Sequence, residues 1–213
     1  MTGPGFFVVI EGPEGSGKST LAAPLAERMR QSGVDPVLTR EPGGTRAAEL
    51  ARQAVLDPEH PVGPLAELFF YLAARSDLVQ TVIRPALTAG RVVLSDRFTL
   101  STEAYQMAGR GLPADVVLPA NQAAAIGLVP DLTLILDLPP AVGRARQEAA
   151  GKRLDRLDGE SAEFHRRVID YYLGVQGKGI RHLDARLPPD RLLQTAWAEL
   201  AAAAPQRFGG ATG

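Results

Sequence analysis

The chain of 213 residues contains no cysteine, which excludes a disulfide framework, cysteine-ligated zinc, iron–sulfur clusters and cysteine nucleophiles. Its three histidines, His60, His165 and His182, are scattered and do not suggest a dense metal site, so we expect them at the surface. No apolar run is longer than seven residues, whereas a membrane helix needs about 18. The N-terminus also lacks the features of a signal peptide. These absences predict a cytoplasmic protein with no membrane partner.

An excess of charge of one sign is also missing. Lys and Arg together number 23 and Asp and Glu 24, which gives a net charge of −1. A general nucleic-acid binder is usually more basic than this, so we predict no nucleic-acid partner. The basic residues are almost all arginine, with lysine only at positions 18, 152 and 178.

Short apolar runs alternate along the chain with longer stretches of helical pattern. We expect strands near 6–10, 35–39, 92–94, 132–138 and 180–184, and helices near 19–31, 46–56, 65–87, 101–106, 115–127, 161–175 and 189–203, with a further helix that begins at 139–140. Strands separated by helices indicate βαβ units, and therefore an α/β fold with a five-stranded parallel sheet between two helical layers. We expect a single domain over residues 1–204 and a disordered tail over 205–213.

A glycine-rich loop joins the first expected strand to the first expected helix. Its residues from Gly12 to Ser19 fit the pattern G-x-x-x-x-G-K-[ST] in the strand–loop–helix context that this pattern requires. Backbone N–H groups of such a loop surround phosphate oxygens, the lysine reaches the β- and γ-phosphates, and the hydroxyl binds Mg²⁺. We therefore predict an ATP site formed by Gly12, Pro13, Glu14, Gly15, Ser16, Gly17, Lys18, Ser19 and Thr20. Asp96, at the end of an apolar strand, suits the second metal ligand beside Ser19.

Other motifs narrow the class of phosphate-loop protein. GTPases use Asn-Lys-x-Asp to read guanine, but the only asparagine, Asn121, is followed by Gln122. The Leu-Ser-Gly-Gly signature of transporter ATPases is also missing. Small-molecule kinases remain as the main class.

Four further segments follow the expected strands, where open α/β sheets bind ligands. They are TREPGG (39–44), FFYLAAR (69–75), LSDRF (94–98) and STEAYQ (101–106). Tyr71 and Arg75 are four residues apart, as are Ser101 and Tyr105, so each pair shares a helix face.

Several nearby residues are given structural interpretations instead. We interpret Phe69 and Phe70 as core residues, and Arg46, Arg52, Arg84 and Arg91 as solvated charges. Arg144 and Arg146 fit either a solvated helix face or adenine contacts.

With GRG (109–111), PDLTLILDL (130–138) and LDRLD (154–158), these segments resemble the thymidylate kinase family from about Phe6 to Asp184. The resemblance implies transfer of the γ-phosphate of MgATP to dTMP, a three-layer P-loop fold with a short mobile lid near 147–158, and a homodimer formed through helix faces. Two alternatives remain open: a kinase acting on dUMP, dCMP or AMP, and a nucleotide-binding protein without catalysis.

The resemblance also implies roles for single residues. Arg40 and Arg97 would grip the phosphate of dTMP, Tyr71 would stack on thymine, and Arg75 would hydrogen-bond a thymine carbonyl. Ser101 and Thr102 would lie at the other base edge, Tyr105 against the deoxyribose, and Glu14 near the 3′-hydroxyl.

Some family members carry a catalytic arginine where this chain has Gly15, whereas others place the cation in the lid. Here the lid segment offers Lys152, Arg153 and Arg156. We predict Arg153 as the catalytic lid residue, together with Lys18 and Arg97.

Overall fold

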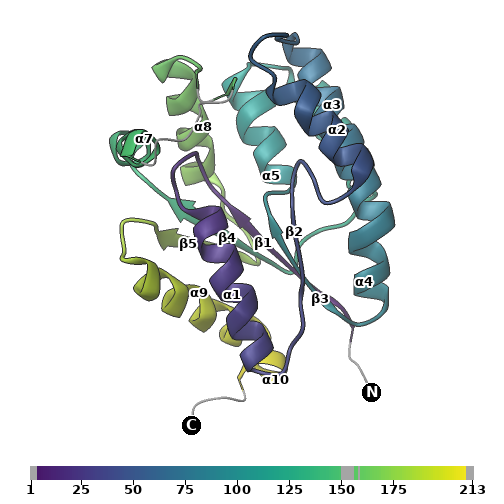
Figure 1. Cartoon of the computed structure of the whole chain (residues 1–213), viewed down its shortest axis with the longest axis vertical. Coiled ribbons are helices and arrows are strands. Elements are labelled where there is room, and N and C mark those ends of the chain that lie inside the picture. Colours follow the sequence, from purple (N-terminus) through teal and green to yellow (C-terminus); the bar gives the residue numbers. More distant parts are fainter. Residues whose placement is uncertain (1–3, 150–155, 158, 210–213) are drawn as a thin grey trace.

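The computed structural model describes residues 4–149, 156–157 and 159–209. Five strands form an all-parallel sheet in the order β2-β3-β1-β4-β5 (Figure 1). The strands are β1 (Phe6–Glu11), β2 (Val37–Arg40), β3 (Val92–Asp96), β4 (Leu132–Asp137) and β5 (Ile180–Asp184). The predicted α/β fold and parallel sheet are confirmed. After β1 the chain forms β2 and β3 on one side of this strand and then crosses to form β4 and β5 on the other side. Open α/β sheets bind ligands where the strand order changes direction in this way.

Helices cover both faces of the sheet. They are α1 (Lys18–Gln31), α2 (Arg46–Leu56), α3 (Pro64–Leu78), α4 (Arg84–Thr88), α5 (Thr99–Thr102), α6 (Ala114–Ala124), α7 (Pro140–Ala149), α8 (Ala162–Gly174), α9 (Pro189–Ala203) and α10 (Pro205–Phe208). Two π-helical segments, η1 (Val79–Ile83) and η2 (Glu103–Gly109), continue α3 and α5. In the part of the chain that the structure describes, no helix is both long and apolar enough to span a bilayer.

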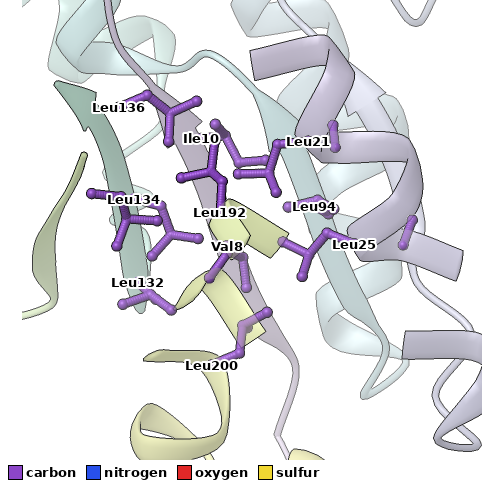
Figure 2. Close-up of a cluster of buried hydrophobic side chains, with 14 of the residues drawn as sticks. Val8, Ile10, Leu21, Leu25, Leu94, Leu132, Leu134, Leu136, Leu192 and Leu200 are labelled. Carbon is purple, nitrogen blue, oxygen red and sulfur yellow. The ribbon is translucent and has the colours of Figure 1, made fainter. Parts of the chain in front are cut away.

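Side-chain alternation along β1 divides the core into two layers. Val8 and Ile10 point to one face of the sheet, where they pack with side chains of α1 and α9 (Figure 2). Phe7 and Val9 point to the opposite face and pack against η1 and α4. Strands buried on both faces read as continuous apolar runs, which is the pattern that predicted this strand.

Two expectations about apolar residues are wrong. The tail over 205–213 was expected to be disordered, but Pro205–Phe208 forms α10, and Phe208 is buried against the rings of Phe6 and Trp197. Residues 210–213 lie outside the described residues. Phe69 was expected in the core, but it is 55% exposed, because the neighbouring Leu68 and not Phe69 occupies the inward face of α3. In a helix, successive residues point about 100° apart.

Candidate active site

A pocket of about 650 Å³ lies between the glycine-rich loop, the ends of β2 and β3, α3, α5, η2 and the segment after β5. Most of the residues predicted for substrate and metal lie in its wall. These are Glu14, Gly15, Ser16, Gly17, Lys18, Ser19, Thr20, Arg40, Tyr71, Arg75, Asp96, Arg97, Ser101, Thr102 and Tyr105. Gly12 and Pro13 are not in the wall, but their carbonyl groups bind Lys18.

The glycine-rich loop leaves no room for a side chain at position 15. Gly15 has a φ of 73°, a left-handed conformation that residues with a Cβ rarely adopt. A Cβ at this position would lie 2.4 Å from the carbonyl oxygen of Gly143 in α7. A side chain at position 15 would therefore collide with the backbone of α7 in this structure.

The side chain of Lys18 folds back onto the glycine-rich loop. Its Nζ donates to the carbonyl oxygens of Gly12, at 2.9 Å, and Pro13, at 2.7 Å. Burial of the ammonium, together with the nearby charge of Arg97, lowers the pKa of Lys18 to about 8.

Ser19 and Asp96 meet beside Lys18. The Ser19 hydroxyl donates to Oδ2 of Asp96 at 2.6 Å, and Oδ1 of Asp96 is buried without a hydrogen-bond partner in the described part of the chain. Among residues 4–149, 156–157 and 159–209, no group of three or more His, Cys, Asp or Glu side chains could hold a metal ion. A hydroxyl and one carboxylate instead fit Mg²⁺, which is commonly held by one or two protein oxygens plus substrate phosphates.

Arg97 follows β3 with a φ of 77°, a strained value for a residue with a side chain. Its Nη2 forms an ion pair with Oε1 of Glu14 at 2.7 Å, and its Nη1 donates to Ser101 Oγ at 3.1 Å. The guanidinium also lies 5.0 Å from the ring centroid of Tyr105, whose hydroxyl donates to the other oxygen of Glu14. Burial alone would raise the pKa of Glu14, but the charges of Arg97 and Lys18 outweigh it and lower the pKa.

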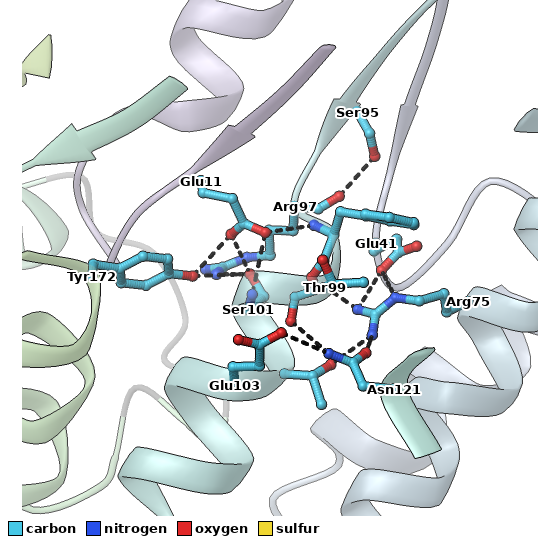
Figure 3. Close-up of polar contacts among 12 residues, drawn as sticks. Glu11, Glu41, Arg75, Ser95, Arg97, Thr99, Ser101, Glu103, Asn121 and Tyr172 are labelled. Carbon is cyan, nitrogen blue, oxygen red and sulfur yellow. Dashed lines mark hydrogen bonds and ion pairs between the residues drawn. The ribbon is translucent and has the colours of Figure 1, made fainter. Parts of the chain in front are cut away.

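Arg75 is buried, and its Nε and both Nη atoms contact protein groups (Figure 3). Its Nε and Nη2 bind Glu41, Nη1 donates to Thr102 and Asn121, and Nη2 also donates to the carbonyl oxygen of Phe98. Arg75 thus joins α3 to the segment after β2, to α5 and to α6 within the pocket wall.

Tyr71 and Arg40, which were also predicted to bind the phosphate acceptor, lie in the pocket wall as well. Tyr71 is half-buried and packs near Tyr105. Arg40 is exposed at the pocket, where its Nη2 forms an ion pair with Glu49 at 2.8 Å.

The prediction that Arg52 is a solvated charge is wrong. Arg52 lines the pocket, and its Nη1 donates to the carbonyl oxygen of Pro42 at 3.2 Å. The chain fold brings α2 against the segment after β2, and no local sequence pattern signals this contact. Of the two arginines on α7, Arg146 lines the pocket and donates to Ala185 O at 2.9 Å, whereas Arg144 is exposed beside Glu148.

The buried polar residues that sequence reasoning missed include Glu11, Glu41 and Gln106. Glu41 lies within TREPGG and Gln106 ends STEAYQ, so both motifs contained a signal. His182 was expected at the surface but is partly buried, between Asp137 and the carbonyl of Val175.

The predicted catalytic residue Arg153, and Lys152 beside it, lie outside the described residues. Arg156 lies among the described residues but not in the pocket wall. Its Nη2 pairs with the buried carboxylate of Glu67, and its Nε donates to Val55 O at 3.1 Å.

Known proteins resemble this chain over most of its length. The family model described as thymidylate kinase matches residues 10–195. A thymidylate kinase of Ectopseudomonas mendocina (strain ymp) is 52% identical over 170 residues, which cover 79% of this chain and 80% of that protein. A thymidylate kinase of Deinococcus radiodurans is 43% identical over 197 residues, which cover 91% of this chain and 95% of that protein.

Proposed function

This chain belongs to the thymidylate kinase family, and on that premise we propose how its residues phosphorylate dTMP to dTDP. The observation that carries the proposal is one pocket that joins the glycine-rich loop to Arg97, Tyr105, Tyr71 and Arg40. A phosphate donor and a nucleoside monophosphate acceptor can therefore meet there. We propose ATP as the donor.

The donor half of the pocket is the glycine-rich loop from Gly12 to Thr20. Its backbone N–H groups and Lys18 hold the phosphates, and Lys18 exchanges its carbonyl partners for phosphate oxygens. Ser19 and Asp96 would hold Mg²⁺, which when bound neutralises charge on the β- and γ-phosphates. Arg146, whose Nη1 donates to Gly15 O at 3.4 Å, would contact the nucleoside end of the donor.

The acceptor half holds dTMP. Arg97 and Arg40 bind its phosphate, and the ring of Tyr71 stacks on thymine. Tyr105 packs against the deoxyribose, which leaves no room for a 2′-hydroxyl. Glu14 accepts from the 3′-hydroxyl, and Ser101 and Thr102 lie at one base edge.

Arg75 stays within the proposed dTMP site as part of its wall. Because its Nε and both Nη atoms already bind protein groups, a thymine carbonyl would have to compete with these partners for Arg75.

The transfer step needs no general base, because a phosphate monoester whose second pKa is about 6 is mostly dianionic at pH 7. The residues bring two polyanions together and meet the charge that develops on the transferred group. Lys18 and Arg97 supply part of this positive charge, and we propose that Arg153 supplies the rest.

The proposal also includes a cytoplasmic homodimer. The exposed Leu65 and Phe69 on α3 offer an apolar helix face for a second copy.

A coupled assay with ATP and each of dTMP, dUMP, dCMP and AMP tests the assignment. We expect dTMP to give the highest kcat/KM. A higher value for another monophosphate would replace dTMP as the substrate, and no turnover with any of them would leave only nucleotide binding.

A further inference from the structure

Glu11, the last residue of β1, is completely buried, although its side chain is a carboxylate. An ionised carboxylate is stable in such a place only when several donors satisfy it. Nothing in the reaction as described so far uses this group. What it binds therefore indicates its role.

The carboxylate holds the turn that follows Arg97 (Figure 3). Oε1 accepts from the backbone N–H of Phe98, at 2.8 Å, and from that of Ser101, at 3.2 Å. Oε2 accepts from the hydroxyl of Ser101 at 2.6 Å and from that of Tyr172 at 2.9 Å. Glu11 thus binds both ends of this turn, Phe98 and Ser101, and it directly precedes the glycine-rich loop in the chain.

The direction of the Ser101 hydroxyl connects this carboxylate to Arg97. A hydroxyl has one proton, and here it points to Glu11. The oxygen of Ser101 is therefore an acceptor toward Nη1 of Arg97, which donates to it at 3.1 Å. Arg97 also has a strained φ of 77°, which persists only when the surroundings enforce it. Its backbone N–H is fixed to Ile10 O at 2.9 Å, one residue before Glu11.

We propose that Glu11 is a positioning residue for phosphoryl transfer, which holds the turn from Phe98 to Ser101 so that the Arg97 guanidinium faces the acceptor phosphate. This inference rests on the proposed role of Arg97. Tyr172, which comes from α8, also donates to this carboxylate, so α8 is tied to β1 at this point.

The test is a double-mutant cycle of Glu11→Gln with Arg97→Lys. Glutamine keeps the shape and one acceptor oxygen of Glu11 but removes the charge. We expect Glu11→Gln to lower kcat about tenfold to a hundredfold, the scale of a misplaced catalytic group. The KM for ATP should change little. Because Glu11 acts through Arg97, the double variant should be no slower than Arg97→Lys alone.

Tyr172→Phe is the matched control, because it removes one donor from the carboxylate and leaves the turn bound; its kcat should fall less than that of Glu11→Gln. If Glu11→Gln does not fold, Ser101→Ala replaces it in the same cycle, and non-additivity with Arg97→Lys is again the expected result.

Wild-type kcat in Glu11→Gln, or losses that multiply in the double variant, would overturn the inference. Wild-type kcat in Arg97→Lys would show instead that the proposed role of Arg97 is wrong, and the inference would fail with it.

Discussion

Lys18 couples donor binding to pH. In the free protein its ammonium is buried against carbonyl oxygens, and its pKa is lowered to about 8. Phosphate oxygens favour the charged form, so bound ATP raises this pKa. Above about pH 8 the free protein lacks this proton, and ATP binding must take one up.

We therefore expect ATP affinity to fall as the pH rises through about 8, with proton uptake appearing in the same range. Calorimetry in two buffers of different ionisation enthalpy measures the uptake. Lys18→Met should abolish both the uptake and turnover, whereas Lys178→Met, an exposed lysine elsewhere, should change neither. Equal uptake in Lys18→Met would assign the proton to another group.

Arg75 matters for stability as well as for the pocket. Glu41 is buried, and its pKa is raised by burial although Arg75 opposes this. Arg75→Ala leaves that carboxyl without its cation, and breaking a buried pair costs about 3–5 kcal/mol. We expect this loss in the free energy of unfolding, measured with urea.

Arg144→Ala is the control, because the Arg144 pair is highly exposed and should change stability by less than about 0.5 kcal/mol. The double variant Arg75→Met with Glu41→Leu should recover part of the loss. If Arg75→Ala is as stable as the parent and loses only dTMP affinity, Arg75 serves the base and not the wall.

At the scale of elements, the local pattern of apolar residues, glycine and proline predicted several strands and helices correctly. The strand at 180–184 and the helices at 46–56 and 189–203 match the structure residue for residue. The π-helical segments η1 and η2 were missed, because the helical pattern read from the sequence does not distinguish an i→i+5 bond from an i→i+4 bond.

The same limit applies to the site. Motif residues such as Lys18 and Asp96 could be predicted, since their spacing and position after strands imply their chemistry. Glu11 and Arg52 could not be predicted, because each depends on a contact that the fold creates. Glu11 binds Ser101, and Arg52 binds the carbonyl oxygen of Pro42.

His182 on β5 ties the end of β4 to the end of α8. Its Nδ1 lies 2.9 Å from Oδ1 of Asp137, and its Nε2 lies 2.8 Å from Val175 O. Both contacts are best with both nitrogens protonated. Partial burial lowers the pKa of His182, but the hydrogen bonds to Asp137 and Val175 outweigh burial and raise it.

The stability that this tie contributes is fully present below the unfolded pKa of about 6.5. It is lost as the pH rises through the higher folded pKa. We expect the Tm of the parent to fall across this range relative to that of His182→Gln. His165→Gln, on α8, should follow the parent curve. Parallel curves for the parent and His182→Gln would show that the histidine does not titrate in this way.

At the scale of the whole molecule, α3 presents one face inward and another to solvent. Glu67 and Arg75 are buried, whereas Leu65 and Phe69 are 48% and 55% exposed. If a second copy covers this face, Phe69→Glu should lower the mass measured by light scattering from that of a dimer to that of a monomer. The monomer should still be folded, which a cooperative thermal transition would show. Val129→Glu, at a more exposed position, should leave the mass unchanged. A parent that is already monomeric would refute the dimer.

The cations of the pocket already have anionic or carbonyl partners before any substrate arrives. Arg97 holds Glu14, Arg40 holds Glu49, and Lys18 holds two carbonyl oxygens. Each incoming phosphate must therefore compete with a protein group that already binds the cation. A ligand with a single carboxylate carries the same charge as Glu14, so it gains no electrostatic advantage when it displaces Glu14. A dianionic phosphate carries more charge than either resident glutamate. The pocket should therefore bind doubly charged anions in preference to singly charged ones. Acetate or chloride at assay concentrations should inhibit more weakly than inorganic phosphate.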